Sequence, residues 1–167
     1  MNVNKIFIPS NALAIMNELT KRGFEAFVVG GCVRDSILGI TPHDWDIATN
    51  APVVEVIDIF DGINMFFTET SLKHGTVTIV INGENFEVTT YRIDRNCDGR
   101  HAEVEFARTI EEDLSRRDLT FNAMAYNDVR GLIDPFGGVT DLMDGTVRPV
   151  GNADERFSED FLRMFRV

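Results

Sequence analysis

The sequence FEAFVVGGCVRDSILG, residues 24–39, joins a short apolar run to a pair of glycines and a polar stretch with helical character. The run from Phe24 to Val29 is rich in residues that favour strands, so we expect a strand, a glycine turn and the start of a helix. Because glycine has no side chain, the backbone at Gly30 and Gly31 can approach a phosphate group, and the first N–H groups of the next helix carry partial positive charge. The spacing matches neither a dinucleotide-binding loop nor a P-loop, and an ordinary tight turn is the alternative interpretation.

Hydrophobic patterns on both sides of this stretch predict further helices and strands. Upstream, the apolar residues follow a helical period between Ser10, which can cap a helix, and Gly23, which can stop it. Downstream we expect a strand at 45–49, a helix at 52–60 opened by proline, and a hairpin of strands at 76–81 and 86–91 joined by a turn at 82–85.

The second half of the chain is more polar. Thr109 and Glu112 have the S/T-x-x-E spacing of a capping box, which predicts the start of a helix. We expect, in chain order, a loop at 93–108, a helix at 109–117, a second helical segment at 121–126, turns over 132–151 and a helix with an apolar stripe at 152–167.

Length and composition exclude several classes of protein. The 167 residues have the size of one ordinary domain. A net charge of −11 repels phosphate on average, which excludes a histone-like or basic-arm nucleic-acid binder. Cys32 and Cys97 lack the spacing of a zinc finger or a disulfide scaffold, so we expect the protein to be located in the reducing cytoplasm. No apolar run approaches the ~20 residues of a membrane helix, so we expect no membrane partner.

Three acidic residues form the first candidate site. Asp44 and Asp46 are two positions apart in an extended segment, so both carboxylates face the same side. Glu87 lies in an alternating strand pattern, and an adjacent strand could deliver a third carboxylate to the same place. Like charges held close together are tolerated mainly when a cation neutralises them, and Mg²⁺ prefers a few carboxylates plus substrate phosphates. A solvated pair of loop acids is the alternative.

Two further groups combine cations with polar partners. Arg117 and Asp118 precede Asn122 at a helical junction, where neighbours four or five residues apart can converge on a triphosphate or a ribose. Asp160 and Arg163 are three residues apart on the last expected helix, and together they offer an acceptor and a planar donor to the edge of a base. A charged helix end and an ordinary surface salt bridge are the alternatives.

Six motifs, in this order along the chain, carry a resemblance to a known family. They are VVGGCVRDSILG (28–39), DWDIAT (44–49), FEVTTYR (86–92), EEDLSRRDLTFNAMAY (111–126), DPFGGVTDL (134–142) and EDFLR (159–163). Together they resemble the class II tRNA nucleotidyltransferases, which are the CCA-adding enzymes, and their bacterial poly(A) polymerase relatives. No single motif is decisive, but the match spans nearly the whole chain.

The resemblance implies an α+β fold of the polymerase-beta-like nucleotidyltransferase type, a small mixed sheet flanked by helices. Residues 1–150 would form this catalytic head domain, and residues 151–167 would begin an all-helical neck. Asp44 and Asp46 match the family's metal ligands, which implies Mg²⁺ as cofactor, and Glu87 resembles the third catalytic carboxylate.

The resemblance also implies a set of nucleotide-binding residues. One motif holds the phosphates, a second engages the sugar and triphosphate, and a third is an amino-acid template that pairs with CTP and ATP. In that order, the matching residues are Gly30, Gly31 and Arg34; Arg117, Asp118 and Asn122; and Asp160 and Arg163. Residues 134–151 match the family's hinge between head and neck.

The implied activity is the transfer of C and A nucleotides from CTP and ATP to the 3′ end of tRNA by a two-Mg²⁺ mechanism, with release of pyrophosphate. A poly(A) polymerase, a partial CC-adding or A-adding enzyme and a catalytically silent nucleotide-binding module are the alternatives. The family holds tRNA largely through parts that follow the head, and the oligomeric state is left open. Residues 93–108 correspond to a flexible loop of the family but have His101-Ala102 where proline is usual.

Overall fold

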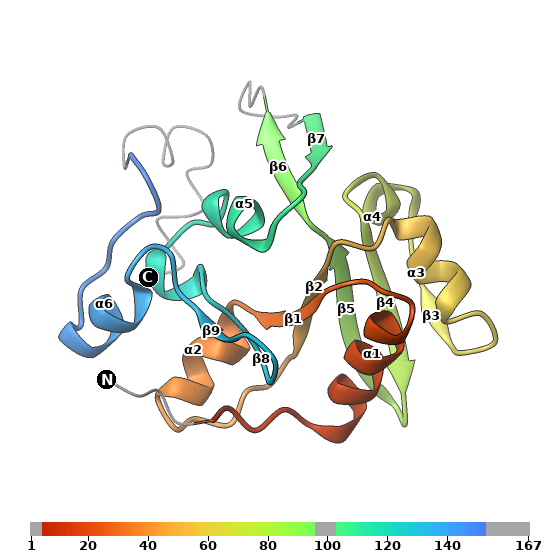
Figure 1. Cartoon of the computed structure of the whole chain (residues 1–167), viewed down its shortest axis with the longest axis horizontal. Coiled ribbons are helices and arrows are strands. Elements are labelled where there is room, and N and C mark those ends of the chain that lie inside the picture. Colours follow the sequence, from red (N-terminus) through yellow and green to blue (C-terminus); the bar gives the residue numbers. More distant parts are fainter. Residues whose placement is uncertain (1–4, 96–102, 153–167) are drawn as a thin grey trace.

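A mixed sheet lies at the centre of the computed structural model, which describes residues 5–95 and 103–152 (Figure 1). The strands are β1 (Ala26–Val29), β2 (Asp46–Thr49), β3 (Met65–Phe66), β4 (Thr76–Ile81), β5 (Glu84–Thr90), β6 (Arg92–Arg95), β7 (Glu103–Phe106), β8 (Ala125–Asn127) and β9 (Gly131–Ile133). Within the described residues, seven of them form one sheet in the order β3-β4-β5-β2-β1-β8-β9, and β6 pairs with β7 alone.

Helices flank this sheet, so the expected α+β fold is confirmed. They are α1 (Ser10–Lys21), α2 (Gly31–Ile37), α3 (Val53–Ile59), α4 (Glu69–Lys73), α5 (Ile110–Ser115), the short 3-10 helix η1 (Thr120–Asn122) and α6 (Gly138–Asp144). None of the described helices is long and apolar enough to cross a lipid bilayer.

Strand β1 is apolar throughout because both of its faces are buried. Its side chains alternate between two cores, as the pleat of a strand requires. Ala26 and Val28 belong to the core that α1 and α3 cover, whereas Phe27 and Val29 belong to a second core that contains Tyr91 and the apolar face of α5. Burying a side chain of the size of Phe27 stabilises the fold by roughly 1.5–3 kcal/mol, so both cores hold the centre of the sheet in place.

The register of the three central strands determines which side chains meet at one edge. Strand β1 pairs antiparallel with β2, and Val29, the last residue of β1, faces Asp46, the first residue of β2. Strand β2 runs parallel to β5, with Ile47 opposite Val88. Asp46 and Glu87 each precede one member of that pair, so the sheet places them side by side next to the glycine turn that follows β1.

Several predicted elements are confirmed with small changes at their ends. Helix α1 begins at Ser10, but Pro9 occupies the cap position and Ser10 makes no side-chain cap, so the predicted Ser10 cap is wrong. Gly23 ends the helix with a φ of 88°, as expected. The hairpin of β4 and β5 is confirmed, and its turn consists of Asn82 and Gly83 alone, both with positive φ.

The predicted loop at 93–108 is wrong, because β6 and β7 form an antiparallel two-stranded arm there. The arm projects from the sheet next to α5 (Figure 1). The arm is not part of the large sheet, and each of its strands is only four residues long, so the alternation in Glu103–Phe106 is a weak signal; Phe106, near its base, is 50% exposed.

The capping box that follows the arm is confirmed. The Thr109 hydroxyl accepts a hydrogen bond from the Glu112 N–H (3.3 Å), and the Glu112 carboxylate accepts one from the Thr109 N–H (3.3 Å). The helix that it opens, α5, ends at Ser115 and not at 117.

Two further predictions fail because tertiary contacts decide the local structure. The segment 121–126 was expected to be helical, but only η1 is helical and β8 follows, where Ala125 pairs with Val29 of β1. Residues 132–151 were expected to be turns, yet they contain α6 and the end of β9. Asp134 stabilises α6, because its carboxylate accepts hydrogen bonds from the N–H groups of Gly138 (2.7 Å) and Val139 (3.0 Å). The helix predicted at 152–167 lies outside the described residues, apart from Asn152.

Candidate functional site

The three acidic residues selected from the sequence line one pocket of about 450 Å³. Asp44 and Asp46 come from the start of β2 and the residues before it, and Glu87 comes from β5, as the strand register requires. All three are exposed to solvent. The complete lining consists of Asp44, Trp45, Asp46, Thr78, Asn85 and Glu87. The structure therefore brings the three carboxylates to a common, solvent-open cavity, which we call the acidic pocket.

The acidic pocket disfavours negative charge on Asp46. Partial loss of hydration raises the pKa of Asp46, and the neighbouring charges of Glu87 and Asp44 raise it further, while Arg117 opposes them. The like charges of Glu87 and Asp44 repel that of Asp46 across a cavity that is open to solvent. A cation bound in the pocket would relieve this repulsion.

The donor set of the acidic pocket fits a hard divalent ion. Within residues 5–95 and 103–152, no group of three or more acidic, histidine or cysteine side chains could by itself hold a metal ion. Mg²⁺ does not need such a group, because it is usually bound by one or two carboxylates and keeps water or substrate phosphate oxygens as its other ligands. Carboxylates at Asp44 and Asp46, facing a cavity with room for such ligands, match that requirement.

The glycine turn contacts the arginine that the sequence singled out. Gly30 has a φ of 75° and a ψ of −128°, a conformation that strongly favours glycine. A Cβ atom at Gly30 would lie 2.8 Å from Nη1 of Arg117, so the guanidinium group packs directly on the bare backbone. Gly31 has no such restriction, because a Cβ there would meet Nη2 of Arg34 at an ordinary 3.6 Å.

Three other predicted nucleotide-binding residues form one hydrogen-bonded chain. Arg34 of α2 donates from Nη1 to Oδ1 of Asn122 (2.8 Å), and Asn122 donates from Nδ2 to Oδ1 of Asp118 (3.4 Å). Asp118 also accepts the N–H of Leu119 (2.8 Å). Asp35 holds the other side of the Arg34 guanidinium by accepting from Nε (2.8 Å). Residues from α2 and from the segment around η1 therefore meet beside the glycine turn.

Sequence reasoning missed Asp113, which lies behind Arg117. Its side chain is 1% exposed and its two oxygens accept hydrogen bonds from Arg116 and Arg117. Arg116 and Arg117 follow α5, three and four residues after Asp113, a spacing that is common on helix surfaces, so the sequence gives no specific signal for it.

Cys32, in the helix that follows the glycine turn, is a structural thiol. Burial, together with the charge of Asp46, raises the pKa of Cys32 to about 12. Its Sγ donates to the carbonyl of Val29 (3.2 Å). The thiol is therefore protonated at neutral pH and is not a nucleophile.

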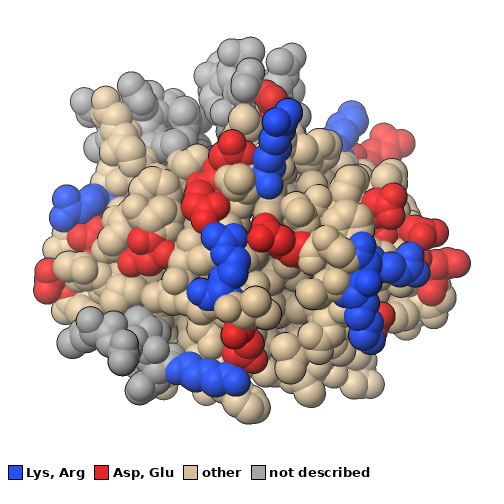
Figure 2. All heavy atoms as spheres, in the orientation of Figure 1, with Lys and Arg blue, Asp and Glu red and all other residues tan. Residues whose placement is uncertain are grey.

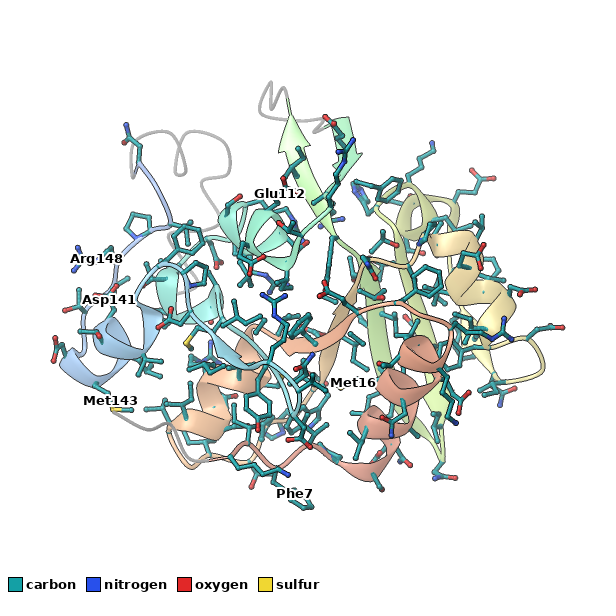
Figure 3. The ribbon with its side chains drawn as sticks, viewed as in Figure 1. Phe7, Met16, Glu112, Asp141, Met143 and Arg148 are labelled. Carbon is teal, nitrogen blue, oxygen red and sulfur yellow. The ribbon has the colours of Figure 1, made fainter. Side chains whose placement is uncertain are left out.

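The segment expected to be a hinge contains an ion pair, and a hydrogen bond and close packing tie it to η1. Figure 3 shows Asp141 and Arg148 close together beside α6. The Asp141 carboxylate accepts from Nε of Arg148 (3.0 Å) and from the hydroxyl of Thr120 (2.7 Å), and these hydrogen bonds lower its pKa. A Cβ at Gly138 would lie 2.2 Å from the Thr120 carbonyl oxygen, so α6 packs backbone to backbone on η1. Asp160 and Arg163, the predicted base template, lie outside the described residues.

A family model described as the poly(A) polymerase head domain matches residues 26–148, which include the acidic pocket and the glycine turn. The chain belongs to this family. Within the head domain, the match begins at β1 and ends just after α6, so it covers the sheet and the site together.

Proteins similar to this head domain are CCA-adding enzymes. One from Ligilactobacillus salivarius is 46% identical over 157 residues, which cover 93% of this chain and 38% of the relative. One from Listeria monocytogenes is 45% identical over 166 residues, covering 98% of this chain and 41% of the relative. This chain thus spans about two fifths of the length of these curated relatives.

Solved structures with the same fold include a complex with a nucleotide and a complex with tRNA. The CCA-adding enzyme of Bacillus stearothermophilus in complex with CTP superimposes with a TM-score of 0.81 at 43% identity, covering 93% of this chain and 36% of that one. The Thermotoga maritima CCA-adding enzyme complexed with tRNA has a TM-score of 0.74 at 27% identity, covering 98% of this chain and 38% of that one.

Proposed function

We propose that this head domain is the catalytic part of a CCA-adding enzyme, which transfers C and A nucleotides from CTP and ATP to the 3′ end of tRNA and releases pyrophosphate. The observation that carries the proposal is the adjacency of a solvent-open acidic pocket and a glycine turn covered by Arg117. Similarity to CCA-adding enzymes at 43–46% identity supports it.

In this proposal the glycine turn and the arginines bind the nucleotide. Because Gly30 has no side chain, the Arg117 guanidinium packs on the turn and presents a fixed positive charge to the phosphates. Arg34 adds a second cation that Asn122 holds in place. Asp118 and Asn122 carry the acceptor and amide groups that can hydrogen-bond the ribose.

The acidic pocket would hold Mg²⁺ through Asp44 and Asp46. Two such ions would supply the charge stabilisation for the attacking and leaving oxygens while the 3′ hydroxyl of tRNA displaces pyrophosphate from the α-phosphorus. The negative charge of Glu87 raises the pKa of Asp46 and so favours a cation in the pocket. Arg117 interacts electrostatically with Asp46 and thereby links the metal side of the site to the nucleotide side.

Recognition of the base and of the RNA belongs to the proposal as well. We assign the choice of C and A over U and G to Asp160 and Arg163, because a carboxylate can accept from the amino group that C and A share. In the proposal, residues 1–150 form the head and residues 151–167 begin the neck. On the face in Figure 2, Lys and Arg side chains lie among Asp and Glu side chains, so RNA contacts would rely on a local patch or on parts beyond the head.

Addition of nucleotides to a shortened tRNA tests the proposal. The full-length protein is given tRNA without its 3′ CCA, Mg²⁺ and labelled CTP and ATP, separately and together. We expect two C and then one A, and a loss of at least about 10³-fold in rate when both Asp44→Asn and Asp46→Asn are introduced. Asp58→Asn, on the exposed side of α3, is the matched control. Unchanged incorporation by the double variant would instead indicate a catalytically silent nucleotide-binding module.

A poly(A) polymerase is the second candidate, because the matching family model carries that description. The same assay separates the two activities by the length of the product. Long A tails made from ATP alone would favour the polymerase, addition that ends after CC or after a single A would favour a partial enzyme, and a product that ends at CCA favours the first proposal.

A further inference from the structure

Asp113 is the most enclosed charged side chain near the site, and the proposed mechanism gives it no role. It lies on α5 with 1% of its side chain exposed, and its carboxylate accepts hydrogen bonds from three residues. Oδ1 accepts from the Arg92 N–H (3.1 Å) and from Nε and Nη2 of Arg116 (3.2 and 3.1 Å). Oδ2 accepts from Nη2 of Arg117 (3.3 Å). Oδ1 therefore binds the Arg92 backbone and Arg116, whereas Oδ2 binds Arg117.

The bond to Oδ2 fixes the half of the Arg117 guanidinium that faces away from the glycine turn. Nη2 is held by Asp113, while Nη1 lies against Gly30, 2.8 Å from where a Cβ would be. Nε of Arg117 is buried and has no hydrogen-bond partner among the described residues, so Asp113 is the carboxylate that orients this planar group.

Two arginines share one buried carboxylate beside the turn. One carboxylate faces two guanidinium groups whose side chains are only 15% and 19% exposed. The Arg117 guanidinium is held next to the bare backbone at Gly30, between Asp113 and the acidic pocket, whose Asp46 it reaches electrostatically. That arrangement suits an anionic group on a ligand.

We propose that Asp113 is a positioning residue that holds Arg117 over the Gly30 turn and so sets the affinity of the site for the phosphates of the incoming nucleotide. This inference rests on the proposed function. It predicts equal effects on CTP and ATP, because Arg117 lies at the turn expected to hold the phosphates, which both nucleotides share.

Asp113→Asn separates positioning from a simple charge effect. The substitution removes a negative charge, and charge alone would make the site more positive and bind a triphosphate more tightly. Loss of the charge-assisted hydrogen bond frees Arg117, so positioning predicts a KM about tenfold higher for both nucleotides, with kcat much less affected. Asp113→Glu keeps the charge but moves it by one methylene group, and we expect the KM to rise in this variant too.

A double-mutant cycle shows whether the effect passes through Arg117. In the Arg117→Met background, Asp113→Asn should leave the KM for CTP and ATP unchanged, because there is no guanidinium group left to orient. Ile110→Val is the control: it shortens a fully buried side chain on the same helix, so it should lower the melting temperature and leave the KM at the wild-type value.

Three results would overturn the positioning role while wild-type incorporation of CTP and ATP persists. They are a KM that stays the same or falls in Asp113→Asn, an equal rise with and without Arg117, and a failure of both Asp113 variants to fold, which would make this residue a folding determinant only. A wild-type protein that incorporates neither nucleotide would instead refute the proposed function itself.

Discussion

Arg117 interacts with two carboxylates that have opposite surroundings. Asp113 is enclosed and meets two arginines, whereas Asp46 is open to solvent and meets two further acids. A buried carboxylate is tolerated when the chain supplies its cations, because an unpaired buried charge is very costly. The acids of the open pocket are crowded, and no Lys or Arg among the described residues lines that pocket, so Arg117 offsets their repulsion only in part and a cation from solution can relieve the rest. Enclosure distinguishes a carboxylate that holds the fold from one that can hold a ligand.

Asp113→Ala should cause the largest loss of stability, because it leaves two nearly buried arginines without their shared acceptor. We expect the free energy of unfolding to fall by roughly 3–5 kcal/mol, measured by chemical denaturation. Asp44→Ala, in the open pocket, is the counterpart and should change stability by less than about 0.5 kcal/mol. Similar losses in the two variants would remove the distinction between the enclosed and the open carboxylate.

Gly30→Ala changes the turn on which Arg117 packs, between Asp113 and Asp46. The added Cβ would clash with Nη1 of Arg117, and the residue would be held at a φ of 75°. We expect a loss of roughly 1–3 kcal/mol in stability and a higher KM for CTP and ATP. Gly39→Ala is the matched control, because Gly39 has a φ of 73° but nothing within 4 Å of the added Cβ, so it should lose stability without a change in KM.

Addition of Mg²⁺ should stabilise the protein through the open pocket alone. At a concentration of about ten times its Kd, a ligand that binds only the folded state adds ~1.4 kcal/mol, which a rise in melting temperature would record. The gain should vanish when Asp44 and Asp46 are both replaced by Asn, and it should persist in Asp113→Glu. An identical gain in the Asn double variant would place the ion elsewhere.

Replacing Asp141 should have the smallest effect on stability. Its carboxylate is buried, but its partner Arg148 is 63% exposed, so water screens the ion pair. Hydrogen bonds from Arg148 and Thr120 lower the pKa of Asp141 below its ordinary value of 3.8. This contribution to stability is therefore present above about pH 3.8 and is lost as the pH falls through the lowered pKa. Asp141→Asn should flatten that part of the curve of stability against pH, and an unchanged curve would contradict the assignment.

The strands that form the site could be predicted because their sequences are strongly patterned. The apolar run of β1 and the hairpin of β4 and β5 carry clear signals of burial and of turn type, and the Asp-x-Asp spacing correctly indicated two acids at one place. The expectation that Glu87 would join them also holds, although only the parallel pairing of β2 and β5 explains why.

Elements that depend on distant partners could not be predicted. Strand β8 forms because Ala125 pairs with β1, and α6 forms where Asp134 caps it and Gly138 meets the carbonyl of Thr120. Neither contact leaves a local pattern in the sequence. Asp113 was missed for another reason: its spacing from the two arginines is ordinary for a helix surface, and only its burial distinguishes it.

The parallel pairing of β2 with β5 has a consequence for how the chain can vary in length. Asp46 and Glu87 are adjacent in space but are separated in the sequence by a crossover that contains α3, β3, α4 and β4. The backbone ladder, and not the crossover, fixes the spacing of the two acids. Insertions or deletions near the tip of the crossover, around Gly62, should therefore be accommodated without disturbing the reactive centre.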